Sequence, residues 1–331
     1  MNVAQRKQHH IQQALRQQGP DGRMHPFDEI RLTHNALPEV SYHSIDLSSQ
    51  LAGCSVHSPL FVSAMTGGIE WANQINQSLA EACREMGWAM GVGSQRIQLE
   101  EDSHEGFRAL RRWIGSGVVF ANFGAVNLPT LKQVSELDRI LEPLQANALV
   151  LHLNPMQEVF QVGGDLNWQG VSDRIAATCE YLSIPVIVKE VGFGLSSEAA
   201  GRLLNLGVAA IDVAGRGGTR FDDIEASANP ARAADARVFA DWGQTTVECL
   251  RSLQGFALPV WASGGLRNGL DAAKAMALGA VGCGFAGRLL EPATRSTAAV
   301  IEQMQQLDQE LRTACYGLGV ARVTDIGRSH L

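Results

Sequence analysis

The sequence predicts an α/β protein, a (β/α)8 TIM barrel with an N-terminal cap segment, and two observations carry this prediction. Short apolar runs recur eight times, and most are continuously apolar rather than alternating, which indicates parallel strands buried on both faces. Segments with helical spacing lie between them, and such alternation indicates βαβ units. Eight units suggest a closed barrel; the doubly wound open sheet, the structural alternative, lacks its GxGxxG motif here. The eight runs are residues 60–65, 88–93, 118–122, 148–153, 186–191, 209–213, 259–263 and 281–285.

Four segments show the apolar spacing of amphipathic helices and supply the helical half of these units. The third begins with Ser196 as an N-cap and an acidic first turn, and Gly207 fits the C′ position at its end. The fourth ends at Gly279 in the same way. The four segments are residues 75–86, 131–144, 196–206 and 268–278.

The chain divides into an N-terminal cap segment, residues 1–59, and a barrel, residues 60–331, within one structural domain. A polar helix over residues 3–16 and a stretch containing Gly and Pro precede the first strand, and we expect them to pack on the barrel mouth and contribute to the substrate site. Residues 217–243 lack clear periodicity, which predicts a long loop that acts as an active-site lid.

Composition narrows the class of protein. The chain has 331 residues, is 45% hydrophobic and carries a net charge of −7 without any block of like charge, which argues against a nucleic-acid partner. The six cysteines form no CxxC pair and no zinc set with histidine, so we expect buried free thiols. No signal peptide or membrane-spanning stretch is predicted, so we expect a soluble, cytoplasmic protein with no membrane partner.

Polar and glycine residues follow the predicted strands, and in this fold the carboxyl ends of the strands form the active site. Two glycine-containing loops, Ser263-Gly264-Gly265 and Ala286-Gly287-Arg288, match a barrel phosphate site, because glycine lets backbone N–H groups approach phosphate oxygens. The alternative is that both loops are only tight turns. The loop from Gly215 to Thr219 is a third candidate.

Lys189 lies within a buried strand, and a buried ammonium needs a negative partner. Neighbouring Glu190 faces the other side of the strand, so we expect a ligand anion or a flavin edge instead. The alternatives are a salt bridge to another core carboxylate and a Schiff-base lysine, as in barrel aldolases.

Two further clusters could bind anions or metals. His152, Asn154, Gln157 and Glu158 follow the fourth strand, and a lone carboxylate beside a phosphate site suits Mg²⁺; the alternative is an exposed loop carboxylate. On the N-terminal helix, Arg6, Lys7 and His10 form a basic patch, because positions three and four apart share a face. Taken alone, this patch fits a solvated helix face.

These motifs together resemble the type 2 isopentenyl-diphosphate isomerases, which are FMN-dependent barrels. The resemblance extends in order from Arg6 to Gly287, and its most specific parts are the N-terminal Arg-Lys and the stretch His-x-Asn-Pro-x-Gln-Glu. The matching segments are Arg6-Lys7-x-x-His10, Met65-Thr66-Gly67-Gly68, Gly93-Ser94-Gln95-Arg96, Asn122-x-Gly124, His152-x-Asn154-Pro155-x-Gln157-Glu158, Val188-Lys189-Glu190-x-Gly192, Gly215-x-Gly217-Gly218-Thr219, Ser263-Gly264-Gly265 and Ala286-Gly287.

The resemblance implies a role for each group of residues. Gln157 would lie near the reacting carbons, with the reduced flavin itself as acid and base, and Glu158 would hold Mg²⁺. The substrate diphosphate would be bound by Arg6, Lys7, His10, Ser94, Gln95, Arg96, His152, Asn154 and Gln157. FMN would be bound by Ala64, Met65, Thr66, Gly67, Ser94, Asn122, Lys189, Thr219, Gly264, Gly265, Ala286 and Gly287.

The resemblance further implies the reaction, a proton shift between the carbons of an allylic system that interconverts isopentenyl and dimethylallyl diphosphate in isoprenoid precursor synthesis. NADPH or another reductant would reduce the FMN, and we expect a homo-oligomer, a tetramer or an octamer. Two positions depart from the family pattern. Thr245 stands where relatives often have proline, and Ala214 stands where many have serine.

Two other functions known on this scaffold each need a catalytic residue that the sequence does not provide. An FMN-dependent oxidoreductase of a small hydroxy acid, the nearest alternative, needs a catalytic histidine, but no histidine lies between His152 and His330. A nucleotide dehydrogenase of the purine pathway needs a nucleophilic cysteine, and no cysteine follows a glycine-rich strand end. A flavin-free aldolase that uses Lys189 and a non-catalytic phosphate-binding barrel stay as further alternatives.

Overall fold

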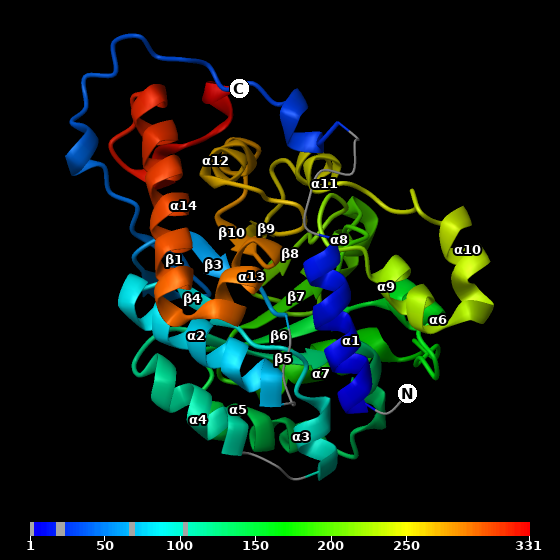
Figure 1. Cartoon of the computed structure of the whole chain (residues 1–331). Helices are drawn as coiled ribbons and strands as arrows, with labels where there is room; N and C mark the ends of the chain where they lie inside the picture. Colours follow the sequence, from blue (N-terminus) through cyan, green and yellow to red (C-terminus); the bar gives the residue numbers. More distant parts are fainter. Residues whose placement is uncertain (1–2, 18–23, 66–69, 102–104) are drawn as a thin grey trace.

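The computed structural model describes residues 3–17, 24–65, 70–101 and 105–331. Eight parallel strands close into a barrel in the order β10-β3-β4-β5-β6-β7-β8-β9, which confirms the predicted fold class and all eight predicted strands (Figure 1). Each strand is shorter than or about as long as its apolar run. The strands are β3 (Leu60–Val62), β4 (Ala89–Gly91), β5 (Val119–Gly124), β6 (Ala148–Leu153), β7 (Val186–Glu190), β8 (Ala210–Asp212), β9 (Val260–Ala262) and β10 (Gly282–Phe285).

Helices follow the strands and surround the barrel (Figure 1). Ser196 caps its helix as predicted, because its side chain accepts a hydrogen bond from Ala199 N at 3.2 Å. The helices of this outer layer are α2 (Glu70–Met86), α3 (Arg96–Glu101), α4 (Glu105–Ile114), α5 (Asp138–Leu144), α7 (Val171–Tyr181), α8 (Ser197–Leu204), α11 (Thr246–Ser252), α12 (Gly269–Ala277), α13 (Gly287–Arg295) and α14 (Thr297–Leu318).

The helix predicted over residues 131–144 begins later than its apolar spacing indicates. A short 3-10 turn, η4 (Val134–Leu137), precedes α5. The Glu136 carboxylate accepts hydrogen bonds from Lys132 N at 2.7 Å and Gln133 N at 3.1 Å. This capping contact starts the helical turn after Gln133.

The barrel interior is packed rather than open. Trp261 lies between two other interior rings, with centroid distances of 5.1 Å to Phe61 and 5.4 Å to Phe120. A hairpin of β1 (Ser49–Leu51) and β2 (Cys54–Val56) closes the amino-terminal end of the strands. Its Leu51 packs so closely on β10 that a Cβ at Gly282 would lie 2.6 Å from the leucine side chain.

The cap segment divides between the two ends of the barrel. The expectation that it packs on the mouth holds for the turn η1 (Pro26–Glu29), where His25 lies beside Gly217 of the loop after β8, and for the first helix. That helix, α1 (Val3–Arg16), has the predicted bounds and contacts α9 and α13 at the carboxyl end (Figure 1).

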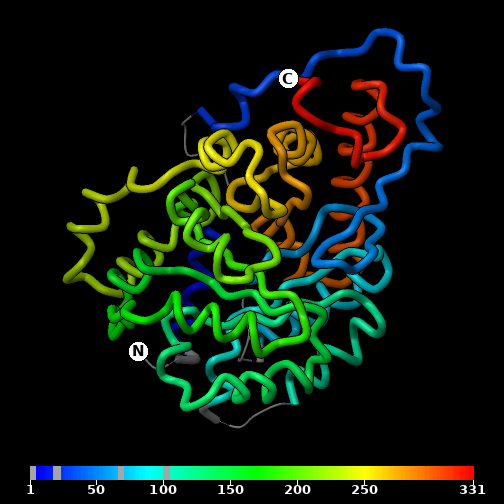
Figure 2. Tube along the Cα trace, turned by 180° about the vertical axis from the view of Figure 1, so that it is seen from behind, coloured from blue at the N-terminus to red at the C-terminus, as the bar shows by residue number. Residues whose placement is uncertain are grey.

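A later part of the segment instead runs along α14 (Figure 2). There Tyr42 Oη bonds Thr313 Oγ1, and Arg312 donates to Ile45 O. This part leads to the hairpin, which buries Leu51 and Val56 at the amino-terminal end of the barrel.

The predicted loop over residues 217–243 is wrong. It forms α9 (Phe221–Ala228), the 3-10 turn η5 (Pro230–Arg232) and α10 (Ala233–Val238). The buried side of α9 carries two acids, Asp222 and Glu225, together with Ile224 and Ala226. These acids interrupt the apolar spacing by which an amphipathic helix is recognised.

All six cysteines are free, and burial raises the pKa of Cys179 to about 11 and the pKa of Cys315 to about 12. The expected burial holds for Cys83, Cys249, Cys283 and Cys315, whereas Cys54 and Cys179 are only partly buried. A thiol with a raised pKa is a poor nucleophile. Within the described residues, no helix combines the length and apolar character that crossing a bilayer requires.

Candidate active site

Three helices meet above the carboxyl end of the barrel around one buried carboxylate, Glu225 of α9. One of its oxygens, Oε1, lies 3.0 Å from His10 Nε2 of α1 and accepts a hydrogen bond from Gln157 Nε2 at 2.8 Å. Gln157 belongs to α6 (Pro155–Phe160), which follows β6. The structure thus joins two predicted site residues through a third that sequence reasoning missed. A single acid in a segment without periodicity resembles a solvated loop residue, so no sequence signal marked it.

Glu158, the predicted metal ligand, lies one residue further along α6 and is buried. Its Oε1 accepts from Asn154 Nδ2 at 2.8 Å, and its Oε2 accepts from Asp165 N at 2.7 Å and Gln161 Nε2 at 3.0 Å. Burial raises the pKa of Glu158, and these hydrogen bonds and the nearby Arg6 charge oppose that rise. The alternative of an exposed loop carboxylate is therefore wrong.

Asn154 leaves an acceptor available beside Glu158. Its Nδ2 donates to Glu158 and, at 3.3 Å, to Gln157 Oε1, whereas its buried Oδ1 has no hydrogen-bond partner among the described residues. A buried polar atom without a partner is costly, so Oδ1 suits a ligand donor or a cation. Across the described part of the chain, no three His, Cys, Asp or Glu side chains are grouped as a complete metal site.

The basic residues of α1 face this cluster. Arg6 is close enough to Glu158 to lower that carboxyl's pKa, and His10 pairs with Glu225. The Lys7 ammonium is shielded from solvent. The patch is therefore part of the site in this structure and not only a solvated helix face.

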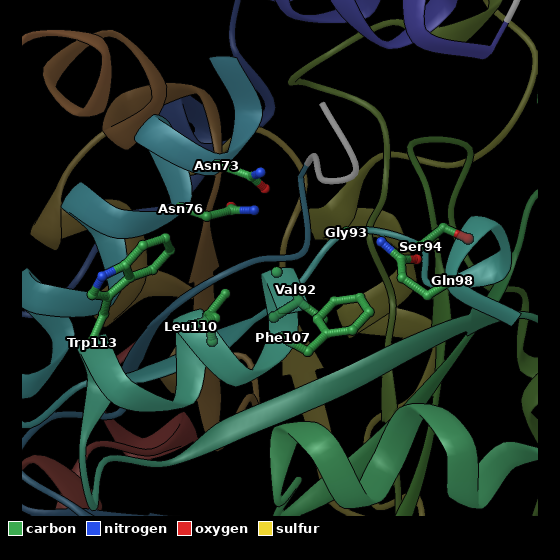
Figure 3. A pocket seen from close by; sticks show the side chains of 10 residues that line it. Asn73, Asn76, Val92, Gly93, Ser94, Gln98, Phe107, Leu110 and Trp113 are labelled. Atoms are coloured by element: carbon green, nitrogen blue, oxygen red, sulfur yellow. The ribbon is translucent and has the colours of Figure 1, made fainter. Parts of the chain in front are cut away.

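The segment after β4 contributes Ser94 and Arg96 but not Gln95. Ser94 lines a pocket with Asn73 and Asn76 of α2 and Phe107 of α4 (Figure 3). Arg96 Nη1 forms a 2.5 Å ion pair with Asp165, whose backbone N–H binds Glu158, so Arg96 is linked to the metal-binding candidate.

Gln95 is fully buried in the barrel wall, so its side chain exposes no surface for the predicted contact with substrate. Its side chain accepts from Asn122 N at 2.9 Å and donates to Ile140 O at 3.4 Å, and its own N–H donates to Asn122 O at 2.9 Å. Since successive residues of an extended segment face opposite sides, Gln95 turns inward where Ser94 faces the pocket.

His152 is held as a neutral hydrogen-bond acceptor. Asn122 Nδ2 donates to Val92 O at 3.0 Å, so Asn122 Oδ1 is the atom that faces His152 Nδ1 at 2.9 Å. The proton therefore resides on Nδ1, and Nε2 keeps its lone pair. Burial and then the Lys189 charge lower the pKa of His152 to about 4.

Lys189 lines a cavity at the barrel centre together with Ser63, Ala64 and Asp212. Its Nζ donates to Glu190 O at 2.6 Å and lies 4.0 Å from Asp212 Oδ2. The alternative of a salt bridge from Lys189 to another core carboxylate is thus present, and that carboxylate is Asp212. Asp212 is a second site residue that sequence reasoning missed. Its position inside an apolar strand gave no sign that it pairs with Lys189.

The glycine loops after β8 and β9 cross in direct contact. Gly264 (φ +90°) and Gly265 (φ +86°) adopt a conformation that favours glycine, and an added Cβ would lie 2.1 Å from Gly215 O and 2.5 Å from Gly217 C, respectively. Glycine is therefore required by loop packing as well as being suited to a phosphate. Thr219 lies just before α9, and Ala286 and Gly287 begin α13, which follows β10.

The FMN-binding candidates after β3 are only partly described. Ala64 and Met65 follow β3, whereas Thr66 and Gly67 lie outside the described residues.

Thr245, which stands where relatives often have proline, caps α11 in a capping box with Glu248. The Thr245 hydroxyl accepts from Glu248 N at 3.2 Å, and Glu248 Oε2 accepts from Thr245 N at 2.7 Å. A proline at this position would lack that N–H, so threonine fixes the loop in a different way.

Structural comparison supports the fold. The chain matches a solved (S)-mandelate dehydrogenase with a TM-score of 0.68 and 16% identity, covering 99% of this chain and 91% of that chain. It matches a Pediococcus acidilactici protein described as a putative lactate oxidase with a TM-score of 0.67 and 16% identity, covering 95% and 84%. At such low identity the likeness shows the barrel fold alone.

Sequence comparison shows the family. Residues 129–331 match the FMN-dependent dehydrogenase family. A protein from Vibrio parahaemolyticus named isopentenyl-diphosphate delta-isomerase is 45% identical over 308 residues, 92% of this chain and 91% of that protein. One of the same name from Xanthobacter autotrophicus is 46% identical over 306 residues, 91% and 89%. The chain belongs to the isopentenyl-diphosphate delta-isomerases, a group of enzymes within the FMN-dependent dehydrogenase family.

Proposed function

We propose that this protein is a type 2 isopentenyl-diphosphate isomerase, which interconverts isopentenyl and dimethylallyl diphosphate by a 1,3-allylic proton shift with reduced FMN and Mg²⁺. The observation that carries the proposal is the meeting of α1, α6 and α9 at Glu225, which connects basic His10 with Gln157, next to buried Glu158. This arrangement offers cations for a diphosphate, a carboxylate for a metal ion and a positioned amide within one site.

FMN fits the carboxyl end of the barrel. Lys189 supplies a partly buried cation, and the glycine loops bring backbone without side chains to the carboxyl end of β8 and β9, which suits the binding of a phosphate group. When bound, reduced FMN would supply the acid and base that move the proton, with no net redox change. The residues that would hold it are Ala64, Met65, Thr66, Gly67, Ser94, Asn122, Lys189, Thr219, Gly264, Gly265, Ala286 and Gly287.

The diphosphate would be bound by Arg6, Lys7 and Arg96, because charged donors suit so anionic a group, and by the ring of His10. Ser94 and Asn154 would add neutral contacts. His152 has a neutral ring with Nε2 as acceptor, so it would take a hydrogen bond from substrate rather than neutralise charge. Arg96 would then exchange some or all of its contact with Asp165 for the phosphate.

Mg²⁺ would bind Glu158, with the free Oδ1 of Asn154 and the substrate phosphate oxygens as further ligands. One carboxylate is enough for Mg²⁺ that is shared with a phosphate group, because this ion keeps several waters. Gln157 would orient the five-carbon chain, held by its hydrogen bond to Glu225. We further infer that NADPH or another reductant reduces the FMN, and that the protein works as a cytoplasmic homo-oligomer.

The test is a variant pair. Gln157→Ala and Glu158→Ala should lose isomerase activity while still binding FMN, since neither side chain is placed against the glycine loops. If both variants retain full activity, the assignment of this cluster is wrong. If the protein binds no FMN, the cofactor part of the proposal fails.

A further inference from the structure

We propose that Asp212 is an electrostatic positioning residue for the flavin: it orients Lys189 and partly cancels its charge, so that bound FMN is harder to reduce than beside Lys189 alone. This inference rests on the proposed binding of FMN at the carboxyl end of the barrel. Asp212 belongs to β8, is 1% exposed and is the carboxylate whose Oδ2 lies 4.0 Å from Lys189 Nζ.

Burial raises the pKa of Asp212, and the contacts of this side chain oppose that rise by favouring the charged carboxylate. Its Oδ1 accepts from Ser263 N at 3.0 Å and Ala214 N at 3.2 Å, and Ser263 Oγ lies 2.8 Å and 2.9 Å from its two oxygens. Hydrogen bonds from N–H and O–H donors and a nearby ammonium favour the ionised form, against the effect of burial.

The same contacts link three elements that would surround the flavin. Lys189 is the last residue but one of β7, Ala214 begins the glycine loop after β8, and Ser263 directly precedes Gly264 and Gly265. Ala214 has φ +35°, a conformation that L residues rarely adopt, and its N–H is directed to Asp212. One carboxylate therefore lies beside the cation and accepts hydrogen bonds from both loops.

The other charged groups near Lys189 do not replace Asp212. His152 is neutral, because burial and the Lys189 charge lower its pKa to about 4. Glu190 faces the opposite side of β7, and its Oε2 accepts N–H groups from Val191, Gly192, Phe193 and Gly194 at 2.6 to 3.2 Å. The charge balance on the Lys189 side of the strand thus depends on Asp212.

Reduction adds two electrons to FMN and increases its negative charge unless protons are taken up, so a less compensated ammonium favours the reduced form. In D212N the amide oxygen can still accept from Ser263 N and Ala214 N, but the negative charge is absent. We expect reduced FMN to gain about tenfold in affinity relative to oxidised FMN, which for a two-electron couple is a rise of about 30 mV in midpoint potential.

The experiment is an anaerobic reductive titration of FMN-loaded wild type, D212N and D308N at one fixed pH. Asp308 is the matched control, because it is another acid that accepts from a serine hydroxyl, Ser58 Oγ at 2.7 Å, and from an N–H group, here Trp88 Nε1 at 3.1 Å. Those partners precede β3 and β4 at the other end of the barrel. D308N should lower stability without moving the potential. A raised potential in D212N alone supports the inference, and an unchanged potential in D212N overturns it.

A second comparison covers the case in which D212N does not fold. D212N leaves the Lys189 ammonium without its carboxylate partner. The pair K189M and K189M/D212N avoids this problem, because neither variant contains the lysine charge. The double variant should have a higher potential than K189M, because removing the carboxylate still favours the reduced flavin. Equal potentials overturn the inference. If the wild-type protein binds FMN but does not isomerise isopentenyl diphosphate, the proposed function is contradicted. The role of Asp212 in setting the flavin potential is not affected by that result.

Discussion

Replacing Glu225 with Gln tests whether the contact among α1, α6 and α9 serves catalysis. The two side chains have nearly the same shape, and the carbonyl oxygen of Gln can take the place of Oε1 between His10 and Gln157. The substitution therefore removes the charge and keeps the packing. Gln157 keeps a neutral hydrogen bond, and His10 loses its anionic partner.

The size of the effect follows from the hydrogen bond of Gln157, because His10 Nε2 lies 3.0 Å from Glu225 Oε1 without forming one. A hydrogen bond to a charged group contributes about 1 kcal/mol more than one between neutral groups. Since 1.36 kcal/mol corresponds to a factor of ten, kcat/KM should fall about fivefold. Glu225→Ala should cost more, because it leaves Gln157 Nε2 without an acceptor.

The assay measures isomerase activity with reduced FMN, together with FMN affinity and thermal unfolding. Asp222→Asn is the matched control: Asp222 is a buried acid on the same helix, but it pairs with Arg220 at 2.9 Å. That variant can weaken α9 and should change kcat/KM far less. Wild-type kcat/KM in E225Q, or an equal loss in D222N, would refute a role of Glu225 in the site.

Four further predictions follow from single contacts. Arg96→Ala should raise KM about tenfold with little change in kcat, because one cation facing the diphosphate is lost; an unchanged KM contradicts the assignment. Glu158→Gln should abolish the response to added Mg²⁺ while FMN still binds, which a metal titration of activity checks. The pKa of His152 falls from its ordinary 6.5 to about 4 in the folded protein, so stability should decrease as pH drops from 6.5 to 4, by up to about 3 kcal/mol, and His152→Asn should flatten that slope in urea unfolding curves. Thr245→Ala removes an N-cap and should lower the free energy of unfolding by about 1 kcal/mol, with activity unchanged if the loop only needs the cap for stability.

The sequence predicted the barrel well because its signal is repeated. Eight buried parallel strands each need an apolar run, and helix ends such as Ser196 follow local capping rules. The segment over residues 217–243 failed for the opposite reason. Its helix α9 turns Glu225 toward the site, so a polar residue occupies a position where the helical pattern requires an apolar one.

The site was only partly predictable for a related reason. Motifs marked His10, Gln157 and Glu158, but the partners that orient them come from elements distant in sequence, as Glu225 does. Gln95 shows the reverse case. A contiguous motif groups it with residues predicted to bind substrate, whereas the extended chain turns its side chain into the barrel wall.

The most direct test of the account is an anaerobic isomerase assay of the purified protein with isopentenyl diphosphate, Mg²⁺ and FMN, with and without a reductant. The account predicts dimethylallyl diphosphate only when the flavin is reduced and Mg²⁺ is present. No isomerisation under these conditions, together with bleaching of the bound flavin by a 2-hydroxy acid, would contradict it and indicate an oxidoreductase on the same barrel.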